Sequence, residues 1–205
     1  MAKCGIDEAG RGPLIGPMVM AVVCGDSSEL KRIGVADSKK LAPKRREFLY
    51  KELSGFVQNH VIILPAEIDM YVRDKKLNVM EEYHTLKLIS LLPVDSVIYV
   101  DSFDVDESRL ESKLRSASGK EIICRHHADD TYPQVSAASI VAKVIRDGEI
   151  EKLHDKFGDF GSGYPSDPRT VRFVKNAIKN HINIDSIVRH EWKTYKNMFN
   201  SKLRY

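Results

Sequence analysis

The residues of this sequence whose types and spacing could do chemistry are acids at the ends of apolar, strand-like segments. Asp7 and Glu8 are adjacent where the first segment ends, Asp101 ends "SVIYVD", and Asp129 follows "EIICRH". Carboxylates that share a site repel one another, and the repulsion grows as water is excluded. Hard divalent ions relieve it, and oxygen-only ligands favour Mg²⁺ or Mn²⁺ over Zn²⁺. We therefore expect these four acids to form a site for hard divalent ions.

Each acid also has an ordinary structural explanation when it is taken alone. Asp7 could belong to a turn, Glu8 could be a surface residue, and Asp101 could cap a helix. Asp129 or its neighbour Asp130 could open one. These explanations are harder to hold together, because "IDE" and "YVDS" both place a charge at the end of an apolar strand.

The glycines in "GIDEAGRGPLIGP" (5–17) raise the possibility of a nucleotide-binding loop. A P-loop needs Lys and Ser or Thr where this chain has Arg11 and Gly12, and a dinucleotide fingerprint needs a glycine where it has Ile15. Both motifs are therefore excluded. What remains is a loop whose bare backbone can approach a ligand closely, with Arg11 available for a phosphate. The glycines also permit the strand to break, which Glu8 needs if it is to share a face with Asp7.

The elements that must position these residues follow from hydrophobic periodicity and from turn residues. Short strands that lie close together come first, and strands that alternate with helices follow. We predict an α/β fold with a mixed five-stranded sheet flanked by helices, and with a basic helical extension packed on it. We expect a catalytic domain at 1–167 and the extension at 168–205. The predicted strands are 2–7, 18–24, 61–64, 96–101 and 121–126, and the main predicted helices are 43–56, 78–92, 106–116, 134–157 and one that opens at 168.

The charge of this chain is distributed unevenly. Residues 168–205 hold 9 Lys and Arg against 2 Asp and Glu, whereas residues 1–167 hold 23 against 27. The basic part is either a solvated helix face or a flank that binds a polyanion beside an acidic centre.

The cysteines and the apolar runs bear on the compartment. Cys4, Cys24 and Cys124 are an odd number without a CxxC pair, so we expect no disulfide and no zinc site, and a reducing cytoplasm. Cys124 with His126 and His127 lacks a fourth ligand for a soft metal. The longest apolar run is too short to span a bilayer. We expect a cytoplasmic monomer without a membrane anchor.

Five stretches together resemble one family, ribonuclease HII, in the order that the family has them. They are "GIDEAGRGPLIGP", "DSKKL" (37–41), "YVDS" (99–102), "HADDTYPQVSAASIVAKV" (127–144) and "GSGYPSDP" (161–168), and the compact C-terminal part with "VRHEWKT" is similar to the archaeal form. The resemblance implies a ribonuclease H-like fold and cleavage of RNA in RNA/DNA hybrids or at ribonucleotides embedded in duplex DNA. It implies that Asp7, Glu8, Asp101 and Asp129 are catalytic. Asp129 is preferred to Asp130 because the family's acid directly follows the alanine.

The resemblance also implies how substrate is bound. The backbone of Gly10, Arg11 and Gly12, together with Tyr164, would read the 2′-hydroxyl at an RNA-to-DNA junction. Lys39, Ser139 and Lys143 resemble the family's phosphate contacts, although Ser139 could merely pack and Lys143 could snorkel. Tyr164 taken alone could be a surface loop residue.

Two features near the C-terminus complete the prediction. Trp192 is assigned no role, because such a residue more often packs than stacks on a base. The tail "NSKLRY" is faintly similar to the sliding-clamp-binding tails of some archaeal relatives, but it lacks the expected glutamine and spacing.

Two other functions remain open. One is a metal-dependent DNA-cutting nuclease of the same fold class, such as a junction resolvase, which would be indifferent to a 2′-hydroxyl. The other is a non-catalytic nucleic-acid-binding module whose acids serve structure. Cleavage of a duplex with one ribonucleotide, but not of an all-DNA duplex, separates these from a ribonuclease.

Overall fold

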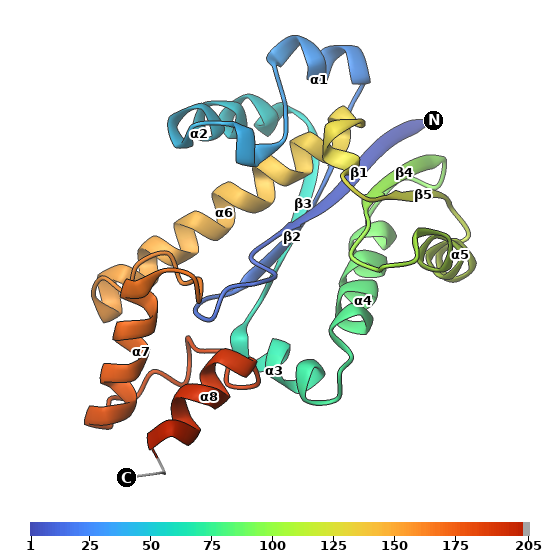
Figure 1. Cartoon of the computed structure of the whole chain (residues 1–205). Coiled ribbons are helices and arrows are strands. Elements are labelled where there is room, and N and C mark those ends of the chain that lie inside the picture. Colours follow the sequence, from blue (N-terminus) through green and yellow to red (C-terminus); the bar gives the residue numbers. More distant parts are fainter. Residues whose placement is uncertain (203–205) are drawn as a thin grey trace. The chain divides into compact units, whose positions relative to one another are not determined.

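The computed structural model describes residues 1–202, and its framework is a mixed five-stranded sheet of order β3-β2-β1-β4-β5 (Figure 1). Strand β1 pairs antiparallel with β2 and parallel with β4, and β4 pairs parallel with β5. The sheet with its flanking helices confirms the predicted fold class. The strands are β1 (Ala2–Ala9), β2 (Met18–Cys24), β3 (Val57–Ile63), β4 (Ser96–Asp101) and β5 (Glu121–Arg125).

The helices largely follow the predicted periodicity. The long helix begins at Pro133, one residue before the predicted start, and ends at Phe157 as predicted, whereas the helices at 27–33, 65–73 and 193–202 were not assigned from sequence. The α-helices are α1 (Ser27–Ile33), α2 (Pro43–Glu52), α3 (Pro65–Arg73), α4 (Leu77–Ser90), α5 (Glu107–Ser118), α6 (Pro133–Phe157), α7 (Pro168–Asn180) and α8 (Lys193–Lys202), and the short 3₁₀ turns are η1 (Ser38–Lys40), η2 (Leu53–Gly55) and η3 (Ala128–Asp130). No helix within residues 1–202 has the length and apolar character needed to cross a membrane.

The chain divides into two compact units, which interleave along the sequence. The sheet unit comprises residues 1–9, 19–62 and 78–145, and the loop unit comprises 10–18, 63–77 and the chain from Arg146 onward. Helix α6 contributes its first half to the sheet unit and its second half to the loop unit. The predicted extension from residue 168 lies in the loop unit, which also contains the glycine loop.

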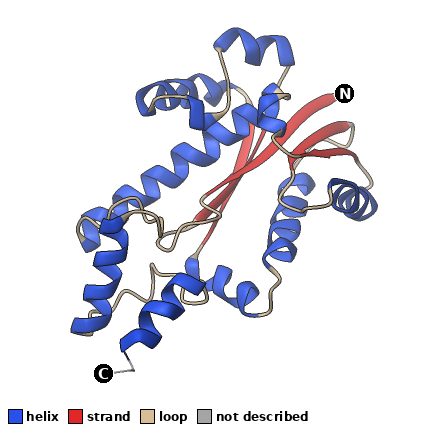
Figure 2. Ribbon diagram, in the orientation of Figure 1, coloured by secondary structure: helices blue, strands red, loops and turns tan. Residues whose placement is uncertain are grey.

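The sheet unit is built on apolar side chains from β2 and from three helices. Buried Val19, Ala21 and Val23 of β2 pack against α1, α2 and the small-residue face of α6. Figure 2 shows the first half of α6 along one side of the sheet and α4 along the other. Gly5 of β1 allows the close approach of α6, because a Cβ there would lie 2.2 Å from the backbone of Gln134 and of Val135. This contact fixes β1 against the N-terminal end of α6.

The loop unit has its own core. Leu14 and Ile15 from the glycine-rich segment pack with Ile150 of α6, Phe160 and residues of α7 and of the segment 184–188. The backbone of Leu14 and of Ile15 donates to the carbonyl of Gly163 at 2.8 and 3.1 Å. The segment that follows β1 is therefore an internal part of this unit.

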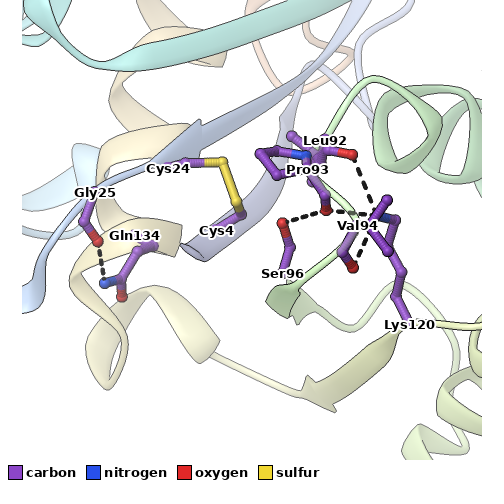
Figure 3. The surroundings of a disulfide bond; sticks show 9 residues. All are labelled: Cys4, Cys24, Gly25, Leu92, Pro93, Val94, Ser96, Lys120 and Gln134. Carbon is purple, nitrogen blue, oxygen red and sulfur yellow. Dashed lines mark hydrogen bonds between the residues drawn. A yellow bond between two sulfur atoms is a disulfide. The ribbon is translucent and has the colours of Figure 1, made fainter. Parts of the chain in front are cut away.

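The structure contains a disulfide, and the expectation that the cysteines stay unpaired was wrong. Cys4 of β1 lies directly opposite Cys24 of β2 in the antiparallel register, and the two sulfur atoms are bonded (Figure 3). An odd count and the lack of a CxxC motif say nothing about two cysteines that strand pairing brings face to face. Cys124 is buried and free.

Candidate active site

Asp7 is one of two predicted catalytic acids that are almost fully buried, the other being Asp129. Asp7 lies on β1, one of the central strands, with only 5% of its surface exposed. Burial, followed by repulsion from Asp101, raises the pKa of Asp7 from its ordinary 3.8 to about 8. Hydrogen bonds from the Glu8 amide at 2.7 Å and from the Ser139 side chain oppose this rise without cancelling it. Asp7 is therefore a carboxylate whose charge the protein compensates only in part.

Asp101 and Asp129 share the surroundings of Asp7. Asp101 is the last residue of β4 and accepts a hydrogen bond of 2.9 Å from the Ala128 amide, which ties it to the turn that carries Asp129. Burial raises the pKa of Asp101 despite this bond, and burial followed by repulsion from Asp101 raises that of Asp129. Asp129 also contributes to the shift of Asp7. Three acids from distant parts of the chain thus gather at one place, as predicted.

Glu8 differs from these three. The sequence suggested that the strand breaks near Asp7, but β1 continues to Ala9, because Glu8 and Ala9 pair with Met20 and Val19 of β2. In a regular strand successive side chains point to opposite faces, so the continued pairing does not supply the break that was expected to bring Glu8 beside Asp7. The catalytic role of Glu8 stays a prediction.

Asp130 and Asp129 are neighbours with opposite environments. Asp130 is exposed and forms an ion pair with Lys40, and the hydrogen bond from Lys40 lowers the pKa of Asp130. Asp129 is only 4% exposed and has a raised pKa. The geometry therefore assigns Asp129, not Asp130, to the acidic cluster.

The chemistry of this donor set suits a hard divalent cation. The cluster offers carboxylate oxygens whose like charges raise one another's pKa, which is the imbalance that a cation removes. Within residues 1–202, no three or more His, Cys, Asp or Glu side chains are placed so that they could hold a metal ion by themselves. Mg²⁺ does not require one, because it usually binds through one or two carboxylates together with water and substrate phosphates. The residues fit such an ion.

Lys39 and Ser139 both interact with the acids, Lys39 through its charge and Ser139 through a hydrogen bond. Burial alone would lower the pKa of Lys39, but Asp129, Asp37, Asp7 and Asp101 outweigh it and raise the value. Ser139 is 3% exposed, and its hydroxyl lies 2.8 Å from that of Ser38. Because Ser139 also bonds to Asp7, it links η1 to the acidic cluster. Lys143 follows Ser139 by one helical turn on α6 and is partly exposed.

The predicted substrate loop, Gly10–Gly12, lies in the loop unit and begins directly after β1. Gly10 has φ of +89°, a conformation that favours glycine, and a Cβ there would lie 2.6 Å from Arg146 Nε and 2.8 Å from the Pro17 carbonyl oxygen. At Gly12 a Cβ would meet only Tyr164 Cε1, at 3.8 Å. The loop and Tyr164 are therefore neighbours, as the prediction requires.

The ring of Tyr164 lies against the guanidinium of a buried arginine, Arg146. The guanidinium carbon of Arg146 lies 5.2 Å from the centroid of the Tyr164 ring, a cation–π arrangement. Arg146 is 2% exposed, and its Nε and Nη2 donate no hydrogen bond. Burial lowers the pKa of this guanidinium.

Arg189 and Trp192 contact the loop, and sequence analysis gave neither a role. Arg189 is fully buried and donates to the carbonyls of Gly10, Arg11 and Gly16. Trp192 Nε1 donates to the carbonyl of Gly12 at 3.2 Å. The signal was present in "VRHEW", where an arginine directly follows two apolar residues, but only folding shows which carbonyls it reaches.

The mixed sheet with acids gathered at the ends of its central strands defines a ribonuclease H-like nuclease. The family model of ribonuclease HII matches residues 4–195. Ribonuclease HII of Picrophilus torridus is 57% identical over 198 residues, which cover 97% of this chain and 98% of the relative. This chain belongs to the ribonuclease HII family and is an endoribonuclease with ribonuclease H activity.

Solved structures agree with this assignment. The crystal structure of ribonuclease H2 from Pyrococcus horikoshii OT3 matches with a TM-score of 0.92 and 41% identity, over 100% of both chains. Ribonuclease HII of Archaeoglobus fulgidus, solved as a complex with PCNA, matches with a TM-score of 0.88 and 43% identity, over 96% of each chain.

Proposed function

We propose that this enzyme uses divalent Mg²⁺ or Mn²⁺ to cut the RNA strand of RNA/DNA hybrids. It also cuts on the 5′ side of single ribonucleotides in duplex DNA, and it leaves 3′-hydroxyl and 5′-phosphate ends. The observation that supports this most directly is the convergence of Asp7, Asp101 and Asp129, whose pKa values are all raised by burial. Acids that only stabilised the fold would be paired with cations or with several backbone donors.

Asp7, Asp101 and Asp129 would hold the ions, with Glu8 as a further predicted ligand. When bound, two such ions position a phosphodiester, activate water and stabilise the departing oxygen. The protein's own contribution is orientation: the Ala128 amide fixes one oxygen of Asp101, and Ser139 and the Glu8 amide hold Asp7. Two of the proposed ligands are thereby set before substrate arrives, which lowers the entropic cost of assembling the site.

Lys39 supplies positive charge beside the acids. Its pKa is raised by four carboxylates, so the ammonium stays charged and can bind a substrate phosphate beside the metal site. Lys143, one turn from Ser139 on α6, is the second proposed phosphate contact. The hydroxyl of Ser139 already forms hydrogen bonds with Ser38 and Asp7. We therefore propose that its main role is to hold the carboxylate of Asp7, and that contact with a phosphate is secondary.

Selection of ribose is assigned to the Gly10–Gly12 loop and Tyr164. The 2′-hydroxyl is the one group that distinguishes a single ribonucleotide from its DNA surroundings, and it can both donate and accept hydrogen bonds. Exposed Gly12 and partly exposed Arg11 present backbone without bulky obstruction, and the ring of Tyr164 lies beside Gly12. These residues can read a hydroxyl and exclude a strand that lacks it.

A sliding clamp is a proposed partner. The support is the Archaeoglobus fulgidus relative, which was solved in complex with PCNA. The candidate segment in this chain is the tail 200–205, of which residues 203–205 lie outside the described part.

A cleavage assay with three duplexes tests the function. The substrates are an RNA/DNA hybrid, a DNA duplex with one ribonucleotide and an all-DNA duplex, each with Mg²⁺, with Mn²⁺ or with chelator. We expect metal-dependent cutting of the first two and none of the third. Equal cutting of the all-DNA duplex would instead indicate a resolvase-like nuclease, and binding without cutting would indicate a non-catalytic module.

A further inference from the structure

We propose that Arg189 is a positioning residue for ribose selection, which sets the direction of the peptide groups in the Gly10–Gly12 loop. The inference rests on the proposed function and adds a residue that does not itself meet the substrate. It is carried by hydrogen bonds within the loop unit, which come from one short segment, 189–192, to one loop.

The contacts of Arg189 are made to backbone carbonyls. Its Nη2 donates to the carbonyl of Gly10 at 2.6 Å and to that of Gly16 at 3.0 Å. Its Nη1 donates to the carbonyl of Arg11 at 2.9 Å, and its Nε donates to that of Gly16 at 3.1 Å. A single planar guanidinium thus holds two carbonyls of the Gly10–Gly12 loop and the carbonyl of Gly16 beyond it.

Trp192 completes the set. Its Nε1 donates to the carbonyl of Gly12, and its ring centroid lies 5.2 Å from the guanidinium carbon of Arg189. Three consecutive carbonyls, those of Gly10, Arg11 and Gly12, are therefore all held by the segment 189–192.

The direction of the loop amides follows from peptide geometry. In a trans peptide the carbonyl and the following N–H point in opposite directions, and the chain has no cis peptide bond within the described residues. Because the carbonyls of Gly10 and Arg11 point toward Arg189, the N–H groups of Arg11 and Gly12 point away from it. Those are the donors that a ribose hydroxyl or a phosphate on the outer side of the loop would use.

Burying an arginine that forms no ion pair costs free energy. The burial of Arg189 therefore calls for a function that offsets this cost. Arg189 is 0% exposed, and burial, followed by repulsion from Arg146, lowers its pKa to about 9. The guanidinium still carries its charge at neutral pH. Five donors in a rigid plane can satisfy several carbonyls at once, whereas the ammonium of lysine cannot reach the same set.

The segment 189–192 is itself held by hydrogen bonds from its backbone amides. The carboxylate of Asp69 accepts from the amides of His190 and Glu191 at 2.7 and 2.9 Å, and the Arg189 amide donates to the carbonyl of Leu14 at 2.9 Å. Arg189 is therefore held from a rigid support, as a positioning residue must be.

The test compares Arg189→Lys, Trp192→Phe and the control Arg73→Lys. Arg73 is an exposed arginine in the same unit that pairs with Glu191 at 3.3 Å, but it makes no hydrogen bond to the loop. The readout is the ratio of kcat/KM on the single-ribonucleotide duplex to that on a long RNA/DNA hybrid. This ratio is insensitive to a loss of active enzyme, because misfolding lowers both values equally.

We expect the ratio to fall about tenfold in Arg189→Lys and about threefold in Trp192→Phe, the size of one or two lost hydrogen bonds to the loop. It should not change in Arg73→Lys. Amide exchange in the peptide that contains residues 10–17 should quicken in the same order. An unchanged ratio in folded Arg189→Lys would overturn the inference.

If Arg189→Lys does not fold, Trp192→Phe decides: a lowered ratio supports the inference and an unchanged ratio overturns it. The wild-type enzyme tests the proposed function separately. If it cuts the all-DNA duplex as fast as the single-ribonucleotide duplex, the function itself fails. If it discriminates and both variants discriminate equally well, only the role of Arg189 fails.

Discussion

The acidic cluster of the sheet unit and the buried arginine of the loop unit present opposite solutions to the burial of charge. Asp7 is buried beside like charges, and its two hydrogen bonds leave its pKa at about 8. Arg189 is buried with four hydrogen bonds to carbonyls. The first group is incompletely compensated by the protein, whereas the second is compensated by backbone dipoles.

This difference separates binding residues from supporting ones. A buried charge that its own protein leaves uncompensated gains most when a ligand of opposite sign arrives, so the acids are suited to a cation. A buried charge that is already hydrogen-bonded gains nothing from a ligand, so Arg189 serves to hold the backbone. Four sets of variants test this distinction.

The largest effect is expected at Asp129, which is compared with its neighbour Asp130. Asp129→Asn should lower kcat by at least about a thousandfold, because it removes a proposed metal ligand, and such a ligand stabilises charge by several kcal/mol. Asp130→Asn, the adjacent control, should stay within about threefold, because Asp130 is exposed and pairs with Lys40. Steady-state cleavage of the RNA/DNA hybrid measures both. A larger loss in Asp130→Asn would reverse the assignment.

The next effect concerns the glycines of the loop. Gly10→Ala should lower the unfolding free energy by about 2–3 kcal/mol, since its positive φ and its contacts with Arg146 and Pro17 leave no room for a Cβ. The melting temperature should fall by about 5–10 °C. Gly12→Ala, which has space, should melt like the wild type but cleave the single-ribonucleotide duplex more slowly. Thermal unfolding and cleavage assays together separate the two, and equal melting of the variants would contradict the steric argument.

A smaller effect is expected at Tyr164. Tyr164→Phe keeps the ring over Arg146 but removes the hydroxyl. Preference for the single-ribonucleotide duplex over the hybrid should fall about tenfold, with no change in melting temperature. Tyr71→Phe, in the same unit, serves as the control. If the preference is retained in Tyr164→Phe, the hydroxyl has no part in ribose selection.

The smallest effect is a gain in stability at Asp7. Because folding raises its pKa from 3.8 to about 8, the folded state binds a proton that the unfolded state releases, and stability falls as pH rises through this interval. Without divalent ions, Asp7→Asn should remove this decline and melt roughly 3 °C higher at pH 8. Melting curves from pH 5 to 8 measure it.

Asp26→Asn is the matched control for Asp7→Asn. Asp26 is an exposed helix cap whose pKa is lowered by the Ser28 hydroxyl, and asparagine caps a helix about as well as aspartate. Its melting curve should follow that of the wild type. If Asp7→Asn melts lower than the wild type at pH 8, the carboxylate of Asp7 is compensated after all.

Local sequence was sufficient for features that depend on one segment at a time. The apolar run that ends in Asp101 predicted both a buried strand and a charge at its end, and Pro133 and Phe157 bounded a helix that the structure reproduces. The family motifs added which acids belong together. Hydrophobic periodicity does not fix the residue at which a strand ends, so the prediction missed that Glu8 and Ala9 still pair with β2.

Contacts between distant segments were decided only by folding. The register of β1 on β2 brings Cys4 opposite Cys24, and this register cannot be inferred from the number of cysteines. Arg189 reaches Gly10 across 179 positions of sequence, and what it bonds is the backbone, which leaves no trace in residue types. The sequence by itself determined the order of the strands along the chain and the identity of the acids, because these follow from local side-chain chemistry. The tertiary structure decided which charges are compensated, because compensation depends on which segments are packed together.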